Sequence, residues 1–175
     1  AIGLWSIVGG LAMISIALIL PMRDWIVLSI GGIVSIFYVV KIGGKSGKSL
    51  AVRELPFIKI FLIAFSWVIT GVVFPWVHHG DWTVLESTEL LWVALEKLCF
   101  IIAITIPFDI RDLEYDDSKM KTLPQLLGIK GSLWLSRILI VTAALFCVVG
   151  GYCAVYSPAA VAALLGCYVF IGGTF

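Results

Sequence analysis

Apolar residues fall into six long runs that are separated by polar connections. The runs cover residues 1–20, 25–42, 57–77, 88–108, 132–152 and 157–175. Each run is close to the ~20 residues that an α-helix needs to cross the hydrocarbon core of a bilayer. None of them alternates apolar and polar residues as a membrane-spanning strand would. Because backbone polar groups inside lipid must be satisfied within the segment, the pattern predicts an all-α bundle of about six transmembrane helices.

The composition agrees with a chain embedded in a lipid bilayer. Hydrophobic residues make up 61% of the 175 residues and charged residues only 13%, against about 25% charged residues in a soluble domain. The mean hydropathy is +1.11. A net charge of +1 gives no bulk field that would attract nucleic acid, and the four cysteines lie in apolar runs without zinc-type spacing. We therefore expect a single transmembrane domain over residues 1–175, without a disulfide or zinc framework. Because the sequence has no initiator Met and both of its ends fall in or beside apolar runs, we also expect it to be cut from a longer protein at both ends.

Basic residues are concentrated in two of the connections. The connection after the second run has five and the one after the fourth has four, whereas the other three connections contain only Arg23. Cytoplasmic loops of membrane proteins carry an excess of Lys and Arg. The two long basic connections are therefore predicted to lie in the cytoplasm, and the first helix to begin there.

The second basic connection also contains the most acidic stretch of the chain, PFDIRDLEYDDSKMKTLPQLLG at residues 107–128. On a helix, Asp109, Asp112 and Asp116 would fall within an arc of roughly 60°. Three carboxylates on one face repel each other and need a balancing positive charge, and oxygen ligands suit Mg²⁺. The alternative is a solvated acidic helix end beside the membrane. The spacing alone leaves both interpretations open.

Two other motifs resemble binding sites but are better explained otherwise. The stretch GGKSGKS at residues 43–49 would need glycine in place of Ile42 and a preceding strand to form a phosphate-binding P-loop. We interpret it as a flexible basic loop. His78, His79 and Asp81 stand at the end of the third run, and adjacent histidines point in different directions on a helix. Placement at the membrane interface explains them better than metal binding.

Glu96 and Lys97 are an ionisable pair inside the fourth apolar run. Charged residues at such positions are functional candidates. They could equally pair with each other or with another helix and stabilise the bundle. The sequence leaves these two interpretations open.

The acidic stretch resembles the second aspartate-rich motif of the UbiA superfamily of intramembrane prenyltransferases. Members have the pattern N-D-I-R-D-x-E-x-D, then a basic residue, T-L-P and a closing L-G. This chain has DIRDLEYD at 109–116, KTLP at 121–124 and LG at 127–128. Asp112 and Asp116 match the D-x-x-x-D core of the motif, and Asp109 stands where other members carry Asp or Asn. The stretch RELPFIK at 53–59 also looks like the entry to the family's fifth helix.

The resemblance implies a bundle of nine helices around a cavity open to the cytoplasm, of which this chain corresponds to helices three to eight. It implies transfer of an isoprenyl group from a polyprenyl diphosphate to an acceptor, in which Mg²⁺ lies between two aspartate-rich motifs. Asp109, Asp112 and Asp116 would then be metal ligands, and Asp112 and Asp116 would be essential for catalysis. The family's first aspartate-rich motif has no counterpart here, which is consistent with a fragment that is inactive alone.

Five basic residues are candidates to bind the diphosphate, because they flank the acidic motif or lie near helix ends: Lys41, Arg53, Lys59, Lys119 and Lys121. Arginine suits bidentate phosphate contact and lysine acts as a point charge. The family's Y-x-x-x-K pattern matches at Lys41 only if Phe37 replaces the tyrosine.

The resemblance also suggests a bacterial inner membrane and a role in quinone, haem or related lipid biosynthesis; the acceptor and the length of the prenyl chain stay undetermined. Two other classes of function remain as alternatives. An ion-coupled transporter would use Glu96, Lys97 and the acidic connection as an ion path, and a membrane scaffold would bind nothing there.

Overall fold

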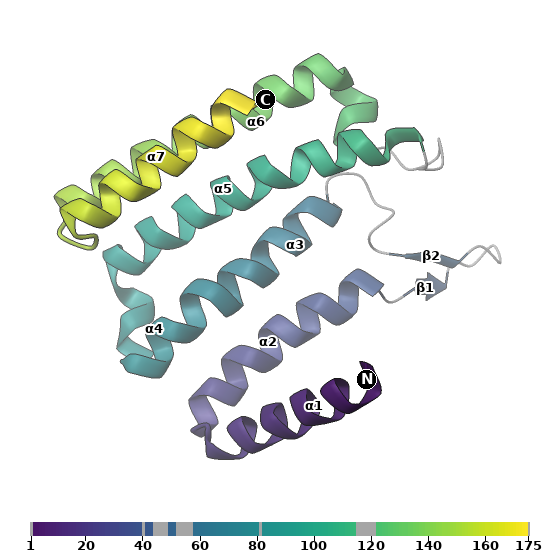
Figure 1. The fold of residues 1–175 in the computed structure, drawn as a ribbon, viewed down its shortest axis with the longest axis vertical. Helices are drawn as coiled ribbons and strands as arrows, with labels where there is room; N and C mark the ends of the chain where they lie inside the picture. The colour runs from purple at the N-terminus through teal and green to yellow at the C-terminus, as the bar shows by residue number, and fades with distance from the viewer. Residues whose placement is uncertain are drawn as a thin grey trace.

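The chain forms a bundle of antiparallel helices joined mostly by short turns (Figure 1). A computed structural model describes residues 2–39, 41–43, 49–51, 58–80, 82–114 and 122–174. In order, the long elements are α1 (Ile2–Ile19), α2 (Met22–Val39), α3 (Ile58–Val68), α4 (Phe74–His79), α5 (Thr88–Arg111), α6 (Leu123–Tyr152) and α7 (Pro158–Thr174). A π-helical turn, Ile69–Val73, joins α3 to α4 without a break, so the described residues form six helical rods. The predicted all-α bundle is confirmed.

Two short strands are an addition to the all-α prediction. β1 (Lys41–Gly43) pairs in antiparallel fashion with β2 (Ser49–Ala51), and Ile42 faces Leu50 in the register. The first and last residues of the stretch 43–49, which was predicted to be a flexible loop, therefore lie in the two paired strands. Its central residues, 44–48, lie outside the described residues.

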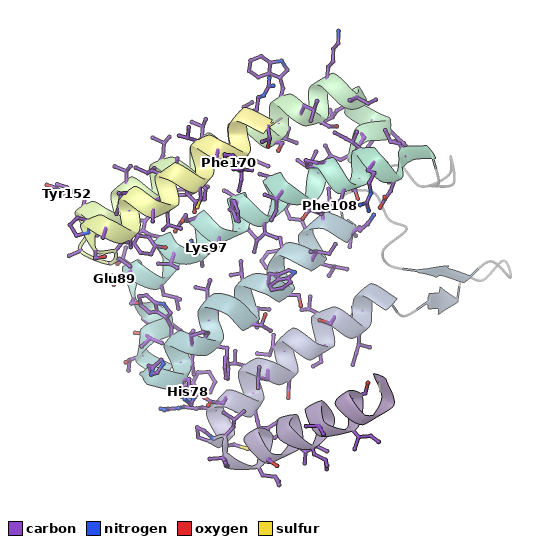
Figure 2. All side chains as sticks on the ribbon, viewed as in Figure 1. His78, Glu89, Lys97, Phe108, Tyr152 and Phe170 are labelled. Carbon is purple, nitrogen blue, oxygen red and sulfur yellow. The ribbon has the colours of Figure 1, made fainter. Side chains whose placement is uncertain are left out.

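Three of the rods are long and apolar enough to cross a membrane. They are Ile58–His79, Thr88–Arg111 and Leu123–Tyr152, and α7 is a shorter apolar helix. Large apolar side chains point outward along the helices in Figure 2; Leu18, Trp67 and Val169, for example, are 81%, 62% and 77% exposed. Such outward-facing apolar surface suits contact with acyl chains. The protein is an integral membrane protein.

The helices that flank the two basic connections meet at one end of the bundle. The strands, the start of α3, the end of α5 and the start of α6 all lie there, whereas the turns α1–α2, α4–α5 and α6–α7 lie at the other end (Figure 1). We call the first the charged end.

Two prolines and one glycine shape the rods. Pro75 follows the π-helical turn at the start of α4, where its missing N–H and its ring disturb the regular helical hydrogen bonds. Pro107 lies inside α5, and the helix continues beyond it to Arg111. Gly128 has φ 70° and ψ 167° and divides α6, a conformation that favours glycine. α6 therefore begins with a short helical stretch from Leu123, and Gly128 separates this stretch from the longer helix that contains the predicted run 132–152.

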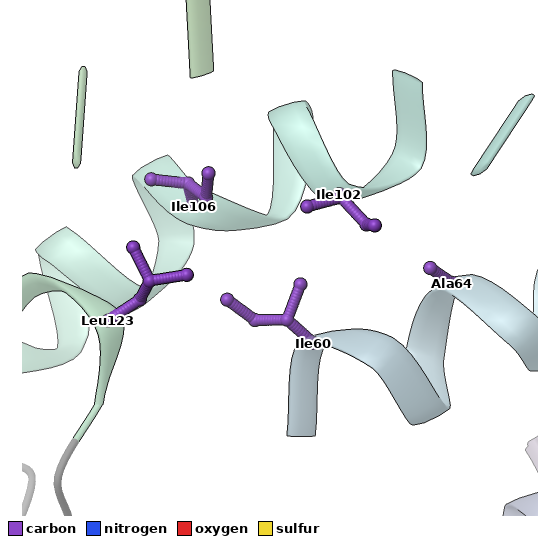
Figure 3. Close-up of a cluster of buried hydrophobic side chains, with 5 residues drawn as sticks. All are labelled: Ile60, Ala64, Ile102, Ile106 and Leu123. Carbon is purple, nitrogen blue, oxygen red and sulfur yellow. The ribbon is translucent and has the colours of Figure 1, made fainter. Parts of the chain in front are cut away.

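The core nearest the charged end joins α3, α5 and the start of α6. Ile60 and Ala64 of α3 face Ile102 and Ile106 of α5, and Leu123 closes the cluster (Figure 3). All five side chains are nearly or completely buried. This packing fixes α3 against α5, the two helices that carry the candidate residues Lys59 and Asp109.

Candidate functional site at the charged end of α3 and α5

Lys59 and Asp109 form an ion pair across the two helices. The Lys59 ammonium lies 2.7 Å from Oδ1 of Asp109. Asp109 is only 2% exposed, and a carboxylate in such a place needs a charged or hydrogen-bonding partner. Asp109 is in the last turn of α5 and Lys59 in the first turn of α3, so the core cluster beneath them sets their distance.

Asp112 lies just beyond the end of α5. The α-helix ends at Arg111, and Asp112 begins a 3₁₀ turn, Asp112–Glu114. The Asp112 carboxylate accepts a hydrogen bond from Nε of Arg111 at 3.0 Å and is more exposed than that of Asp109. The regular α-helix therefore ends just before Asp112.

A pocket of about 480 Å³ opens beside these charged groups. Lys59, Asp109 and Asp112 line one end of it. The remaining lining side chains, apart from Thr105, are apolar: Ile63, Trp67, Phe100, Ile101, Ile104 and Phe108. Asp112 and Phe100 are separated by twelve residues, which correspond to about 18 Å along a helix. The pocket is thus a long apolar space with a charged end.

The structure does not describe the side chains of the other five predicted site residues. Asp116, Arg53, Lys119 and Lys121 lie outside the described residues. The backbone of Lys41 is in β1, at the charged end, but its side chain is not described. Of the eight predicted site residues, the structure brings together Lys59, Asp109 and Asp112.

The donor atoms present fit a hard cation only in part. Two carboxylates, Asp109 and Asp112, border the same pocket, and Mg²⁺ often binds through one or two carboxylates while substrate phosphates and water supply its remaining ligands. No group of three or more His, Cys, Asp or Glu side chains suited to a metal occurs among the described residues. The third predicted ligand, Asp116, is outside them.

A second charged cluster surrounds Glu96, which lies in the half of α5 that begins at Thr88. The Glu96 side chain is completely buried. It accepts hydrogen bonds from the hydroxyl groups of Tyr156 and Tyr168, and the Lys97 ammonium lies 2.9 Å from Oε1. Figure 2 shows Lys97 near the middle of the bundle. The pair predicted from sequence therefore exists, and the tyrosines bind it to α7 and to the α6–α7 turn.

Burial and the hydrogen bond to Glu96 raise the pKa of Tyr156, which lies in the α6–α7 turn. The phenol therefore stays neutral and remains a donor. No sequence signal pointed to either tyrosine, because 60 and 72 residues separate them from Glu96.

A third cluster, at the opposite end of the bundle, joins the start of α2 to the end of α4. Asp24 is completely buried, and its Oδ2 lies 2.5 Å from Nδ1 of His78. Arg23 donates hydrogen bonds to the carbonyl oxygens of Gly80 and His78, at 2.6 and 2.9 Å. Side chains that donate to the last carbonyls of a helix satisfy groups that have no partner within it. This cluster explains His78 as a structural residue.

The comparisons with known proteins add no family assignment. No protein-family model matches the chain, and neither a curated protein nor a solved structure matches it. The geometry of the pocket and the motif beside it are therefore the basis for a functional proposal.

Proposed function

We propose that this chain is the substrate-binding part of an intramembrane prenyltransferase of the UbiA type. Such an enzyme would transfer an isoprenyl group from a polyprenyl diphosphate to a small, aromatic acceptor. The observation that carries the proposal is the pocket that has Lys59, Asp109 and Asp112 at one end and apolar side chains along the rest. This polarity matches an isoprenyl diphosphate, which has a charged head and a long hydrocarbon tail.

The charged end would hold the diphosphate head. The Lys59 ammonium attracts phosphate oxygens, and its ion pair with Asp109 keeps it at the mouth of the pocket. Asp109 and Asp112, together with Asp116, would hold Mg²⁺, and this ion would supply positive charge to the diphosphate leaving group. Lys41, Arg53, Lys119 and Lys121 are proposed to supply further positive charge from the basic connections.

The apolar part would hold the isoprenyl tail and keep water from the reacting carbon. An allylic cation is captured by water unless the site is dry. Phe100, Ile104 and Phe108 present hydrocarbon surface along α5, and Ile63 and Trp67 present it along α3. The acceptor ring would then attack the carbon that the diphosphate has left.

The environment of Glu96 supports this proposal over ion transport. A transport path needs a carboxylate that exchanges an ion or a proton with water. Glu96 is buried, and two tyrosines and Lys97 already occupy its oxygens. That arrangement suits a helix-packing role.

The charged end is proposed to face the cytoplasm, where a water-soluble diphosphate head is available. The excess of Lys and Arg in the two connections at that end supports this orientation. A bacterial inner membrane is the membrane we propose.

Transfer of radiolabelled prenyl groups by membranes that contain the full-length protein is the direct test. We expect transfer that depends on Mg²⁺ and that falls by at least about a hundredfold in Asp112→Asn. The variant would lose a carboxylate ligand of the Mg²⁺ that is proposed to neutralise the leaving diphosphate. Glu89→Gln is a matched control, since it removes a carboxylate from the other end of α5. Absence of transfer, or equal transfer by Asp112→Asn and Glu89→Gln, would contradict the proposal and favour a scaffold.

A further inference from the structure

Arg137 occupies an unusual place for a charged side chain. It lies inside the membrane-spanning helix α6 and is exposed on the outside of the helix. Among the described residues, none of the ion pairs includes Arg137. Its guanidinium lies over the Trp134 ring, with Cζ 5.7 Å from the ring centroid. Intramembrane arginines usually face the bundle interior or pair with an anion. The exposed position therefore calls for an anionic partner from outside the described chain.

The depth of Arg137 agrees with a lipid phosphate as that partner. Arg137 follows Gly128 by nine residues, or about 13 Å along the helix. The neighbouring Ser136 hydroxyl donates to the carbonyl oxygen of Ala103, six residues before Asp109, so Arg137 lies in the half of the bundle nearer the charged end. Helical side chains point toward the N-terminus, which directs its guanidinium toward that membrane surface.

Lys130 and Trp134 extend the same face toward the surface. At 100° per residue, Lys130, Trp134, Arg137 and Val141 fall within an arc of about 60° on α6. Lys130 is exposed and Trp134 is 63% exposed. Tryptophan is enriched at the depth of lipid headgroups, and basic pockets between membrane helices bind anionic headgroups.

A groove continues from Arg137 into the apolar part of the bundle surface. It has a volume of about 310 Å³ and runs between α6 and α7. Ile140, Val141 and Ala144 line it from α6, and Val169 and Gly172 line it from α7. The absence of a side chain at Gly172 leaves α7 open opposite Ile140, whose Cγ2 would be 3.5 Å from an added Cβ.

We propose that this face binds one anionic phospholipid. Lys130 and Arg137 hold its phosphate, Trp134 packs against the headgroup region, and one acyl chain lies in the groove between α6 and α7. A phospholipid fits both the two cations and the groove, because its anionic phosphate is joined to hydrocarbon chains. Lys130 and Arg137 lie nearer the charged end, and the groove continues from Arg137 toward the middle of the membrane. An anionic lipid is favoured over a zwitterionic one, since the ammonium group of the latter would be repelled by the two cations. This site is separate from the pocket between α3 and α5.

The test uses the full-length protein in vesicles of unbrominated phosphatidylcholine. A minor fraction of a lipid with brominated acyl chains is added, and this lipid is phosphatidylglycerol in one sample and phosphatidylcholine in the other. Bromine quenches nearby tryptophan, and the signal of Trp134 is the difference between the parent protein and Trp134→Phe. We expect phosphatidylglycerol to associate about twentyfold more tightly than phosphatidylcholine. Each of the two cations, Lys130 and Arg137, contributes about 1 kcal/mol near an anionic lipid, which corresponds to about fivefold in affinity. Arg137→Gln should reduce the preference by about fivefold, and Lys130→Gln/Arg137→Gln should abolish it.

Matched controls separate the headgroup from the groove. Arg111→Gln removes an equal charge from the charged end of α5 and should leave the preference unchanged. Gly172→Leu should fill the groove and weaken quenching, whereas Gly173→Leu adds the same side chain at a position with nothing within 4 Å and should not. Thermal unfolding of each variant in detergent identifies any that is misfolded.

Three results would overturn the inference. They are equal quenching by the two lipids, a preference that survives in the double variant, and crosslinking at α6 that shows a second copy of the chain covering the groove.

Discussion

The Lys59 ammonium and the Asp109 carboxylate lie 2.7 Å apart and connect the first turn of α3 to the last turn of α5. The two residues are 50 positions apart in sequence. Their pairing places a cation and an anion together at the end of an otherwise apolar pocket. In the proposed enzyme, this pair positions the diphosphate and is also part of the structure that holds the two helices together.

Breaking this ion pair should be costly, because it leaves a buried charge without a partner. We expect Lys59→Gln to lower the free energy of unfolding by about 3 kcal/mol. The double variant Lys59→Met/Asp109→Leu should lose less unfolding free energy than the summed losses of Lys59→Met and Asp109→Leu. Denaturant unfolding in detergent micelles measures all of these values, and additive losses would show that the two side chains do not interact.

The tyrosines that donate to Glu96 should contribute separately to stability. Tyr168→Phe removes a hydrogen bond to a charged acceptor and should lower the free energy of unfolding by about 2 kcal/mol. Tyr152→Phe is the matched control, because the Tyr152 side chain is 93% exposed and its loss should have almost no effect. Equal unfolding midpoints for Tyr168→Phe and the parent protein would contradict the observed contact.

Alkaline pH should weaken the same cluster through Tyr156. Its pKa in the folded protein is raised above the ordinary value of about 10, so the folded state retains a proton that the unfolded state releases. The resulting stabilisation is complete below about pH 10 and is lost as the pH rises toward the folded-state pKa. Between pH 9 and pH 11, the free energy of unfolding should therefore fall more steeply in the parent protein than in Tyr156→Phe. Parallel curves for the two proteins would exclude this linkage.

Gly150 allows the ring of Tyr156 to approach α6. A Cβ at position 150 would lie 2.9 Å from Cε2 of that ring, so Gly150→Ala must displace the tyrosine and weaken its bond to Glu96. We expect a loss of about 2 kcal/mol in unfolding free energy, measured as above. Gly173→Ala, in open space, is the control. The loss should be smaller in a Tyr156→Phe background, and an identical loss there would mean that Gly150 acts in another way.

The apolar part of the pocket should decide how well the isoprenyl tail is bound. Ile104→Trp would fill space between Phe100 and Phe108, so the proposed enzyme should show a KM for prenyl diphosphate at least about tenfold higher. Ile138→Trp places the same bulk on an outward-facing position of α6 that is 56% exposed and should leave KM unchanged. Equal KM values for the two variants, with both proteins folded, would place the tail elsewhere.

Local sequence signals were sufficient to predict the helices but less precise at their ends. Six apolar runs predicted the six helical rods, because a segment in lipid must satisfy its own backbone hydrogen bonds. The ends differ from the apolar runs at two places. A short helical stretch from Leu123 precedes Gly128 in α6, and α5 continues to Arg111, three residues beyond the predicted end of its run. Glycines inside the helices show the same limit, because the sequence does not tell which of them pack closely. A Cβ added at Gly31 or Gly150 would have neighbouring side chains within 4 Å, whereas one added at Gly9 or Gly10 would have none.

The sequence by itself determined that this is a helical membrane protein with its cations concentrated at one end and an aspartate-rich motif among them. Hydropathy and charge along a chain are local properties, so they can be seen without a fold. Only the tertiary structure decided which charges meet. Lys59 joins Asp109, Tyr168 joins Glu96, and Asp24 joins His78, each across at least 50 residues. The physical reason is that helix packing chooses these partners, and a buried charge is stable only where packing brings a counter-charge or a donor to it.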